Sequence, residues 1–204
     1  DGPKSWLRHD PHAAAGARIG YDPWLHSIDW ARGLEKALAA KGASLVAVTP
    51  NPLDAAWDDQ PAPSDAVVTV HDAALAGQGA VEKRAIIADW LKAKGLDTTV
   101  MTALDSIAWT FNIRGTDVSH TPVGLAFALL HADATADLFI APEKITEAVR
   151  AHLGNSVRIH DRNVFEAALA DLAGRQVAVD PDRAVAAIFT ALETAGARIE
   201  RHRD

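Results

Sequence analysis

Apolar residues in the first quarter of the chain follow a helical period between two short extended runs. Four of them fall three or four positions apart, so that they share one helix face: Ile28, Ala31, Leu34 and Leu38. Ser27 is a suitable N-cap for this helix, and Gly42 a suitable stop. Strands are predicted over 17–21 and 45–48, whereas the Pro- and Asp-rich run 51–64 predicts a loop with one helical turn.

Residues 81–94 predict a second amphipathic helix. Ile87 and Leu91 lie four positions apart and should face the core, while the charged residues remain in solvent. These charged residues are Glu82, Lys83, Arg84, Asp89 and Lys92. A strand over 98–101 should pack beneath the helix.

From residue 123 onward, apolar runs alternate with amphipathic ones. The run 123–130 is almost wholly apolar, which predicts a buried strand, and 137–140 should pair with it as an antiparallel hairpin. The rest predicts alternating elements: helices 142–152, 162–172 and 181–195, and strands 157–160, 176–179 and 198–201. This alternation predicts an α/β fold, with a mixed sheet and helices on both of its faces.

Composition excludes several kinds of partner and chemistry. A chain of 204 residues, 49% of them apolar, can bury a sizeable core. A net charge of −7 without any Lys/Arg run gives no attraction to nucleic acid or to an acidic membrane surface. The chain has no cysteine, and no apolar run approaches the roughly 20 residues that span a bilayer. We therefore expect a cytoplasmic protein.

We expect a domain boundary between residues 75 and 76. A brief extended run at 67–70 is followed by Gly77-Gln78-Gly79, which is flexible enough to join two folded units. The chain starts with Asp1-Gly2-Pro3-Lys4, which contains neither an initiator Met nor the apolar core of a signal peptide. We expect a part of a longer protein.

A short helix followed by a dense polar loop is the most informative stretch. Asp105 is placed to cap the first turn of a helix that carries Ile107, Ala108 and Phe111. Loss of such a cap costs about 1 kcal/mol. The loop that follows is the expected place for function.

Arg114 is the leading candidate for binding in that loop. Asn112 and Gly115 suit a chain reversal that leaves Arg114 projecting. Its guanidinium is well suited to hold a carboxylate or a peptide carbonyl. The structural alternative is that Arg114 pairs with Asp117 or another carboxylate of its own loop.

The stretch matches the form L-D-x-I-A-W-x-x-N-x-R-G-x-D-x-x-x-x-P-V. The matching residues are Leu104, Asp105, Ile107, Ala108, Trp109, Asn112, Arg114, Gly115, Asp117, Pro122 and Val123. It resembles the signature of the non-catalytic domain that precedes the metal-binding domain in three-domain Xaa-Pro aminopeptidases of the aminopeptidase P family. Further likeness covers nearly the whole chain: 20–26, 51–54 with Trp57, 82–84, 131–133 and 137–140.

The resemblance implies a creatinase/prolidase N-terminal domain with a ribonuclease H-like fold. Residues 1–75 would be the C-terminal remainder of a first such domain plus a linker, and residues 76–204 a second one. These domains wall the mouth of the catalytic site and limit the peptides that enter. Asn112, Arg114 and His120 would face that mouth and help to position the substrate.

The resemblance places catalysis outside this chain. In the family, a C-terminal pita-bread domain holds two metal ions, expected to be manganese, through two Asp, one His and two Glu. No such set follows Asp204, so we expect no catalytic residue, metal or cofactor here and no activity alone. The expected partners are that catalytic domain and a proline-containing peptide, and the parent enzyme is expected to be a homodimer.

Two alternatives remain open. The chain could be a stand-alone binding or assembly module that has the fold without the peptidase. It could instead belong to a prolidase or a creatinase-type hydrolase, although those lack a second N-terminal domain with this signature.

Other candidate groups lack a complete ligand set. His9, Asp10 and His12 lie close together, but no further ligand follows at a defined spacing, so we expect a fortuitous surface cluster. His152 and His160 flank a predicted strand and are expected to be packing or surface residues.

Overall fold

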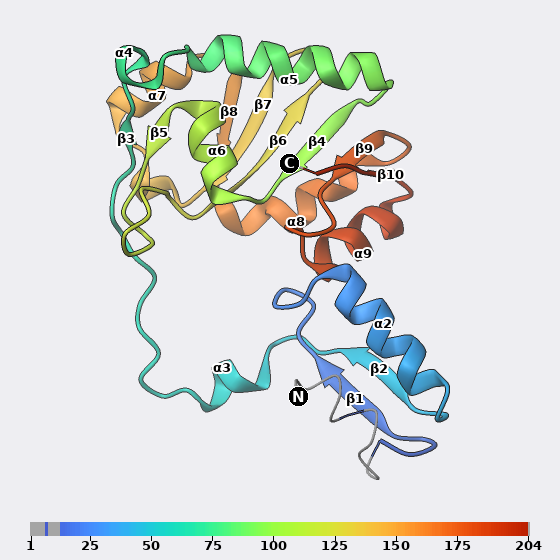
Figure 1. Ribbon diagram of the computed structural model, residues 1–204. Helices are drawn as coiled ribbons and strands as arrows, with labels where there is room; N and C mark the ends of the chain where they lie inside the picture. The colour runs from blue at the N-terminus through green and yellow to red at the C-terminus, as the bar shows by residue number, and fades with distance from the viewer. Residues whose placement is uncertain (1–6, 8–12, 204) are drawn as a thin grey trace. The chain divides into compact units, whose positions relative to one another are not determined.

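The computed structural model describes residue 7 and residues 13–203, which divide into two compact units (Figure 1). The first contains the described residues up to Ala62 together with Val185–Phe189. The second contains Pro63–Ala184 and the described residues from Thr190 onward, so the glycine run at 77–79 belongs to it. Among the described residues, no helix is both long and apolar enough to cross a membrane.

The first unit contains a β-α-β arrangement. Strand β1 (Arg18–Tyr21) pairs in parallel with β2 (Ser44–Ala47), and α2 (Ile28–Ala39) connects them. Ser27 caps α2, since its side chain accepts a hydrogen bond from the Trp30 amide at 3.3 Å, and all four predicted face residues are buried. A short helix, α3 (Pro52–Ala56), is the predicted helical turn. These predictions are confirmed.

The second unit is built on a six-stranded mixed sheet with the order β10-β9-β4-β6-β7-β8. Its strands are β4 (Thr98–Met101), β6 (Ala126–His131), β7 (Ala136–Ile140), β8 (Val157–His160), β9 (Gln176–Val179) and β10 (Arg198–Arg201). Strand β6 runs antiparallel to both β4 and β7, while the other neighbours are parallel. The predicted mixed sheet and its hairpin are confirmed. Two shorter strands, β3 (Thr69–Val70) and β5 (Ile113–Arg114), pair separately.

Alternate residues of β6 and β7 face two different helical layers (Figure 1). Ala128 and Leu138 pack into one cluster with Ile107 of α6 (Leu104–Phe111), on the side that α5 (Ala80–Lys94) also covers. Phe127 and Phe139 contact Phe165 of α8 (Phe165–Ala168) on the other side. The remaining helices are α4 (Ala73–Ala76), α7 (Glu147–Leu153) and α9 (Ala186–Ala195).

Two of the predicted helices are interrupted. The segment 142–152 divides into a 3₁₀ turn, η1 (Pro142–Lys144), and α7, because Thr146 leaves the helical conformation and caps α7. The segment 162–172 consists of η2 (Arg162–Val164), α8 and η3 (Leu169–Leu172). The helix predicted from residue 181 begins only at Ala186.

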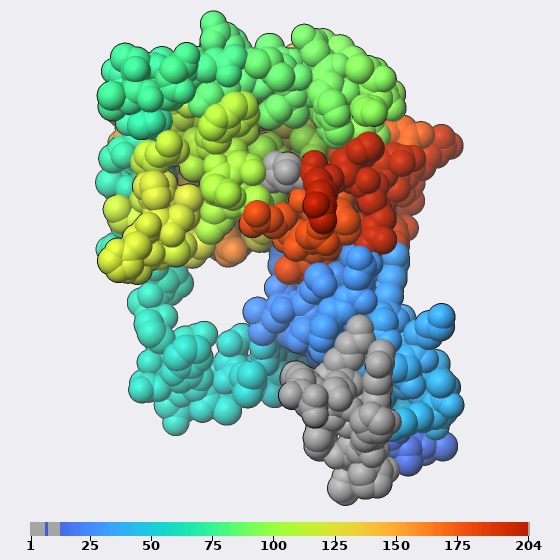
Figure 2. Space-filling view, viewed as in Figure 1, coloured from blue at the N-terminus to red at the C-terminus, as the bar shows by residue number. Residues whose placement is uncertain are grey.

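The predicted orientation of α5 is wrong for two of its charged residues. Lys83 and Arg84 are only 2% and 1% exposed, whereas Val81 and Ile86 lie on the outer side. Figure 2 shows α5 at the surface of the second unit, so the buried charges point inward from a surface helix. Lys83 Nζ finds two acceptors in the interior. Arg84 donates only from Nη2, to Ser156 Oγ at 3.2 Å, and its buried Nε and Nη1 have no partner among the described residues.

Candidate functional site

Helix α6 carries the first half of the signature. Its N-cap is Ala103, which has no capping side chain, and Asp105 is an exposed residue of the first turn. The prediction that Asp105 caps the helix is therefore wrong. Ile107, Ala108 and Phe111 are buried as predicted.

Asn112 ends α6 in the left-handed conformation, with φ of 48°, which Asn tolerates better than most residues. Its side chain is buried: Oδ1 accepts a hydrogen bond from Lys83 Nζ at 2.6 Å, and Nδ2 donates one to the Gln78 carbonyl at 2.8 Å. Asn112 thus connects α5, α6 and the turn between α4 and α5.

The Lys83 ammonium completes the C-terminal end of α6. It donates to the Trp109 carbonyl at 3.1 Å and lies 4.5 Å from the centre of the Trp109 ring. Carbonyls at this end carry the negative part of the helix dipole, which favours a cation. Burial, and secondly the charge of Arg114, lower the pKa of Lys83.

Arg114 lies in β5, half-buried, with Thr69 of β3 as its partner in the ladder. Its Nη1 donates to the Ile113 carbonyl at 3.3 Å. Among the described residues no carboxylate pairs with Arg114, so the alternative of an Arg114–Asp117 pair is not observed. The guanidinium retains donors for a ligand.

Asp117 instead forms a buried ion pair with Lys144 at 2.6 Å. The same carboxylate accepts a hydrogen bond from the Leu125 amide at 2.7 Å. Although burial alone would raise the pKa of Asp117, the bonds from Lys144 and Leu125 lower it. Asp117 therefore fixes the returning chain after the loop.

His120 is exposed at the tip of the same loop. It adopts a positive φ of 60° in a turn that a bridge between Val118 and Thr121 closes. In the described part of the chain, no hydrogen bond joins His120 to Asn112 or Arg114. Of the predicted site residues, the structure thus presents Arg114 and His120 outward and keeps Asn112 inside.

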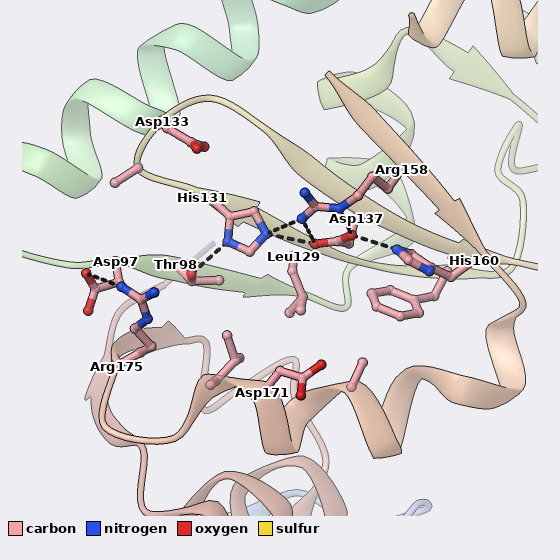
Figure 3. Close-up of a pocket in the computed structure, with 14 residues that line it drawn as sticks. Asp97, Thr98, Leu129, His131, Asp133, Asp137, Arg158, His160, Asp171 and Arg175 are labelled. Carbon is pink, nitrogen blue, oxygen red and sulfur yellow. Dashed lines mark hydrogen bonds and ion pairs between the residues drawn. The ribbon is translucent and has the colours of Figure 1, made fainter. Parts of the chain in front are cut away.

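A second candidate site was not predicted. A cavity of about 420 Å³ lies between the α8 side of the sheet and the η3 segment (Figure 3). Charged and polar groups from the sheet and the facing wall line it: Asp97, Thr98, His131, Asp133, Asp137, Arg158, His160, Asp171 and Arg175. Its apolar lining includes Leu129, Phe139, Ala168 and Leu172.

Asp137 is the centre of the polar cluster on the sheet wall. Arg158 Nε and Nη2 each donate to its carboxylate at 2.7 Å. His131 Nε2 and His160 Nε2 lie 2.8 and 2.6 Å from its oxygens, and because an ionised carboxylate only accepts, both rings donate. Burial alone would raise the pKa of Asp137, but these hydrogen bonds hold it far below its usual range.

These four residues come from three neighbouring strands, which explains why the sequence did not reveal the cluster. The parallel register aligns Asp137 with Arg158 and Phe139 with His160. His131 and Asp137 lie on either side of the hairpin turn, and the sequence pattern predicted only the hairpin. The available signal was the spacing of two between Arg158 and His160 on β8, which places these two side chains on one face of the sheet.

The described residues offer no group of three or more His, Asp or Glu side chains that is arranged to hold a metal ion. The sequence cluster of His9, Asp10 and His12 lies outside the described residues. His152, expected to be a packing residue, lies 2.9 Å from the Phe111 carbonyl through its Nε2.

The chain is similar to known proteins along most of its length. The model of a family described as the creatinase/prolidase N-terminal domain matches residues 59–204. "Probable Xaa-Pro aminopeptidase P" of Aspergillus niger is 38% identical over 161 residues, covering 78% of this chain and 26% of that protein. "Aminopeptidase P2" of Arabidopsis thaliana is 32% identical over 194 residues, covering 93% and 27%.

A solved structure is similar as well. The X-prolyl aminopeptidase of Caenorhabditis elegans, described as a cytosolic enzyme with a di-nuclear active site, superposes with a TM-score of 0.89 at 26% identity. The match covers 99% of this chain and 34% of that chain. The present chain therefore spans about a quarter of the curated relatives and a third of this structure.

Proposed function

The chain belongs to the creatinase/prolidase N-terminal domain family, and from this we propose that it is the non-catalytic N-terminal region of a metal-dependent Xaa-Pro aminopeptidase. One observation carries the proposal: relatives named Xaa-Pro aminopeptidase P and aminopeptidase P2 match most of the chain at 38% and 32% identity. The whole enzyme would release an N-terminal residue that precedes proline. This chain alone would be inactive.

We assign residues 1–75 to the remainder of a first creatinase-type domain with its linker, and residues 76–204 to a second domain. The second would wall the mouth of a catalytic site contributed by the rest of the enzyme and restrict the peptides that enter. The family match over 59–204 supports the second assignment.

Arg114 is the residue that we propose to contact the substrate, together with His120 of the loop that follows β5. Arg114 supports this role because the residue is only partly buried and no described carboxylate pairs with its guanidinium. The sequence predicts Asn112 as a substrate contact as well. We propose that it acts indirectly, because its hydrogen bonds to Lys83 and to the Gln78 carbonyl fix the end of α6. Trp109, 44% exposed on α6, adds an apolar surface nearby.

The metal ions would belong to the catalytic domain. The similarity to an enzyme described as cytosolic and di-nuclear supports two divalent ions and a cytoplasmic location. We propose manganese as the metal, a homodimer as the parent assembly, and a proline-containing peptide and the catalytic domain as partners. A calorimetric titration of this chain alone with Mn²⁺ should show no binding of micromolar affinity.

The decisive experiment compares hydrolysis of an Xaa-Pro-Pro peptide, with added Mn²⁺, by this chain and by the product of the complete reading frame. We expect release of the first residue only from the longer protein. Activity of this chain alone would refute the assignment to a non-catalytic region. Activity in neither protein would favour a stand-alone binding or assembly module.

A further inference from the structure

An apolar groove lies between α5, α6 and β4 of the second unit. It consists of two adjoining cavities of about 290 and 540 Å³, and Ile87 and Met101 line both of them. The apolar lining of the groove comes from these three elements: Ile86, Ile87, Trp90, Val100, Met101 and Trp109. The groove shares no lining residue with the cavity around Asp137, so it is a separate feature of the surface.

The fold leaves the largest side chains of the groove partly uncovered. Ile86 is 55% exposed and Trp109 is 44% exposed, while Trp90 is half-buried. Trp109 belongs to the signature, and the Lys83 ammonium lies over its ring. Apolar side chains gathered at a surface mark an interaction site, and Trp is among the residues most enriched at such sites. The groove is therefore a candidate docking surface.

The C-terminal end of the described chain borders the same groove. His202 and Arg203 line it, and the His202 ring packs edge-on against Trp90 with ring centres 5.2 Å apart. A polypeptide that continues from Arg203 therefore leaves from the rim of the groove. The matched segment is only 26% of the Aspergillus niger relative and 34% of the Caenorhabditis elegans chain. Most of a protein of that length lies outside this chain and is available to cover the groove.

We propose that the groove is the surface on which the part of the longer enzyme that follows this chain docks. An apolar segment of that part would cover Ile86, Trp90 and Trp109. The identity of the occupant rests on the proposed function, and the inference adds to it the surface that joins this region to the catalytic domain. In the 204-residue chain alone, the same side chains stay open to solvent.

Hydroxyl-radical footprinting measures whether the groove is covered. Mass spectrometry gives the oxidation rates of Trp90 and Trp109 in the 204-residue chain and in the product of the complete reading frame. Both rates should fall about fivefold or more in the longer protein, because the core of an interface excludes water. Equal rates in the two proteins would overturn the proposal. A fall in the 204-residue chain alone as its concentration is raised would also overturn it, because the occupant would then be a second copy.

Two substitutions on α5 locate the interface. Ile86→Glu should raise the oxidation rate of Trp109 in the longer protein about fivefold, to that of the shorter chain, because a carboxylate buried without a partner is unfavourable. Val81→Glu is the matched control, since Val81 is 68% exposed on the same helix and does not line the groove. Both variants should leave the urea midpoint of the 204-residue chain unchanged, because both side chains are exposed there. Protection that survives Ile86→Glu, or that Val81→Glu removes equally, would contradict docking at this groove.

The peptidase assay separates this inference from the proposed function. A longer protein that hydrolyses the Xaa-Pro-Pro peptide while Trp90 and Trp109 stay unprotected would refute the docking groove and leave the proposed function intact. Protection of both rings in a longer protein without peptidase activity would support the docking groove and count against the peptidase assignment.

Discussion

Most polar residues of the signature are used within the fold. Asn112 joins Lys83 to the Gln78 carbonyl, and Asp117 holds Lys144 and the Leu125 amide. Arg114 differs, because its guanidinium bonds only to a neighbouring carbonyl among the described residues. At the scale of single residues, the signature is therefore mainly structural, and Arg114 is the residue that we propose for contact with the substrate.

Arg114→Gln in the longer protein tests the proposed contact between Arg114 and the substrate. We expect kcat/KM for an Xaa-Pro-Pro peptide to fall about tenfold or more, because one charge-assisted contact is lost. The melting temperature should stay unchanged, since among the described residues the Arg114 side chain makes one hydrogen bond, to the carbonyl of the neighbouring Ile113. Arg150→Gln, at an exposed position of α7, is the control. Unchanged kinetics would make Arg114 a solvated or structural residue.

Asp137→Asn tests the cluster beneath the cavity. The substitution removes a buried charge that two imidazoles and one guanidinium share. We expect the free energy of unfolding at pH 7 to fall by about 2 kcal/mol, measured by urea denaturation. Asp182→Asn should have no measurable effect, because its ion pair with Arg203 is exposed.

The same variant should change how the free energy of unfolding depends on pH in acid. The folded-state pKa of Asp137 is lowered, so its stabilisation is present above the unfolded pKa of about 3.9 and is lost as pH falls below that value. Wild-type stability should therefore fall more steeply below about pH 4 than that of Asp137→Asn. Parallel curves for the two proteins would show that Asp137 does not carry this stabilisation.

At the scale of elements, the period of the apolar residues predicted those helices and strands whose buried side follows from their own sequence. Helix α2 and strands β8, β9 and β10 follow the expected ranges closely, because their apolar positions alone determine which side is buried. The orientation of α5 was not predictable in this way. Burial of Lys83 depends on carbonyls at the end of α6, far along the chain. The cavity depends similarly on strand register, which local sequence does not fix.

Gly115→Ala tests the close approach of the two chain segments that form the signature loop. A Cβ at this position would lie 2.7 Å from the Gly124 amide nitrogen and 2.8 Å from the Val123 carbonyl oxygen. Because both neighbours are backbone atoms, relief requires the chain to move. We expect a loss of about 2–3 kcal/mol in the free energy of unfolding, measured with urea.

Gly79→Ala is the matched control for that substitution. Gly79 has an ordinary negative φ, and the added methyl group would come no closer than 3.8 Å to Glu82. Its effect should be distinctly smaller than that of Gly115→Ala. Equal losses would mean that the loop accommodates a methyl group at residue 115.

At the scale of the whole molecule, the two units have cores of very different extent. The first relies on a small cluster of Ala13, Leu34, Leu38 and Ala43 beside a two-stranded sheet. The second buries every residue of β7, with a neighbouring strand on each side of it. Two strands with a small apolar face are marginal by themselves, whereas larger sheets with covered faces are not.

This difference predicts unequal opening of the two units under native conditions. Amides of β1 and β2 should exchange with deuterium about a hundredfold faster than those of β6 and β7, since local unfolding exposes the smaller core first. Peptide-resolved hydrogen exchange at neutral pH measures both sets in one sample. Strands β4 and β9 provide an internal reference, because they lie inside the large sheet and should behave as β6 does. Equal rates in β1, β2, β6 and β7 would instead mean that the chain opens as one cooperative unit, so that the small core draws its stability from the large one.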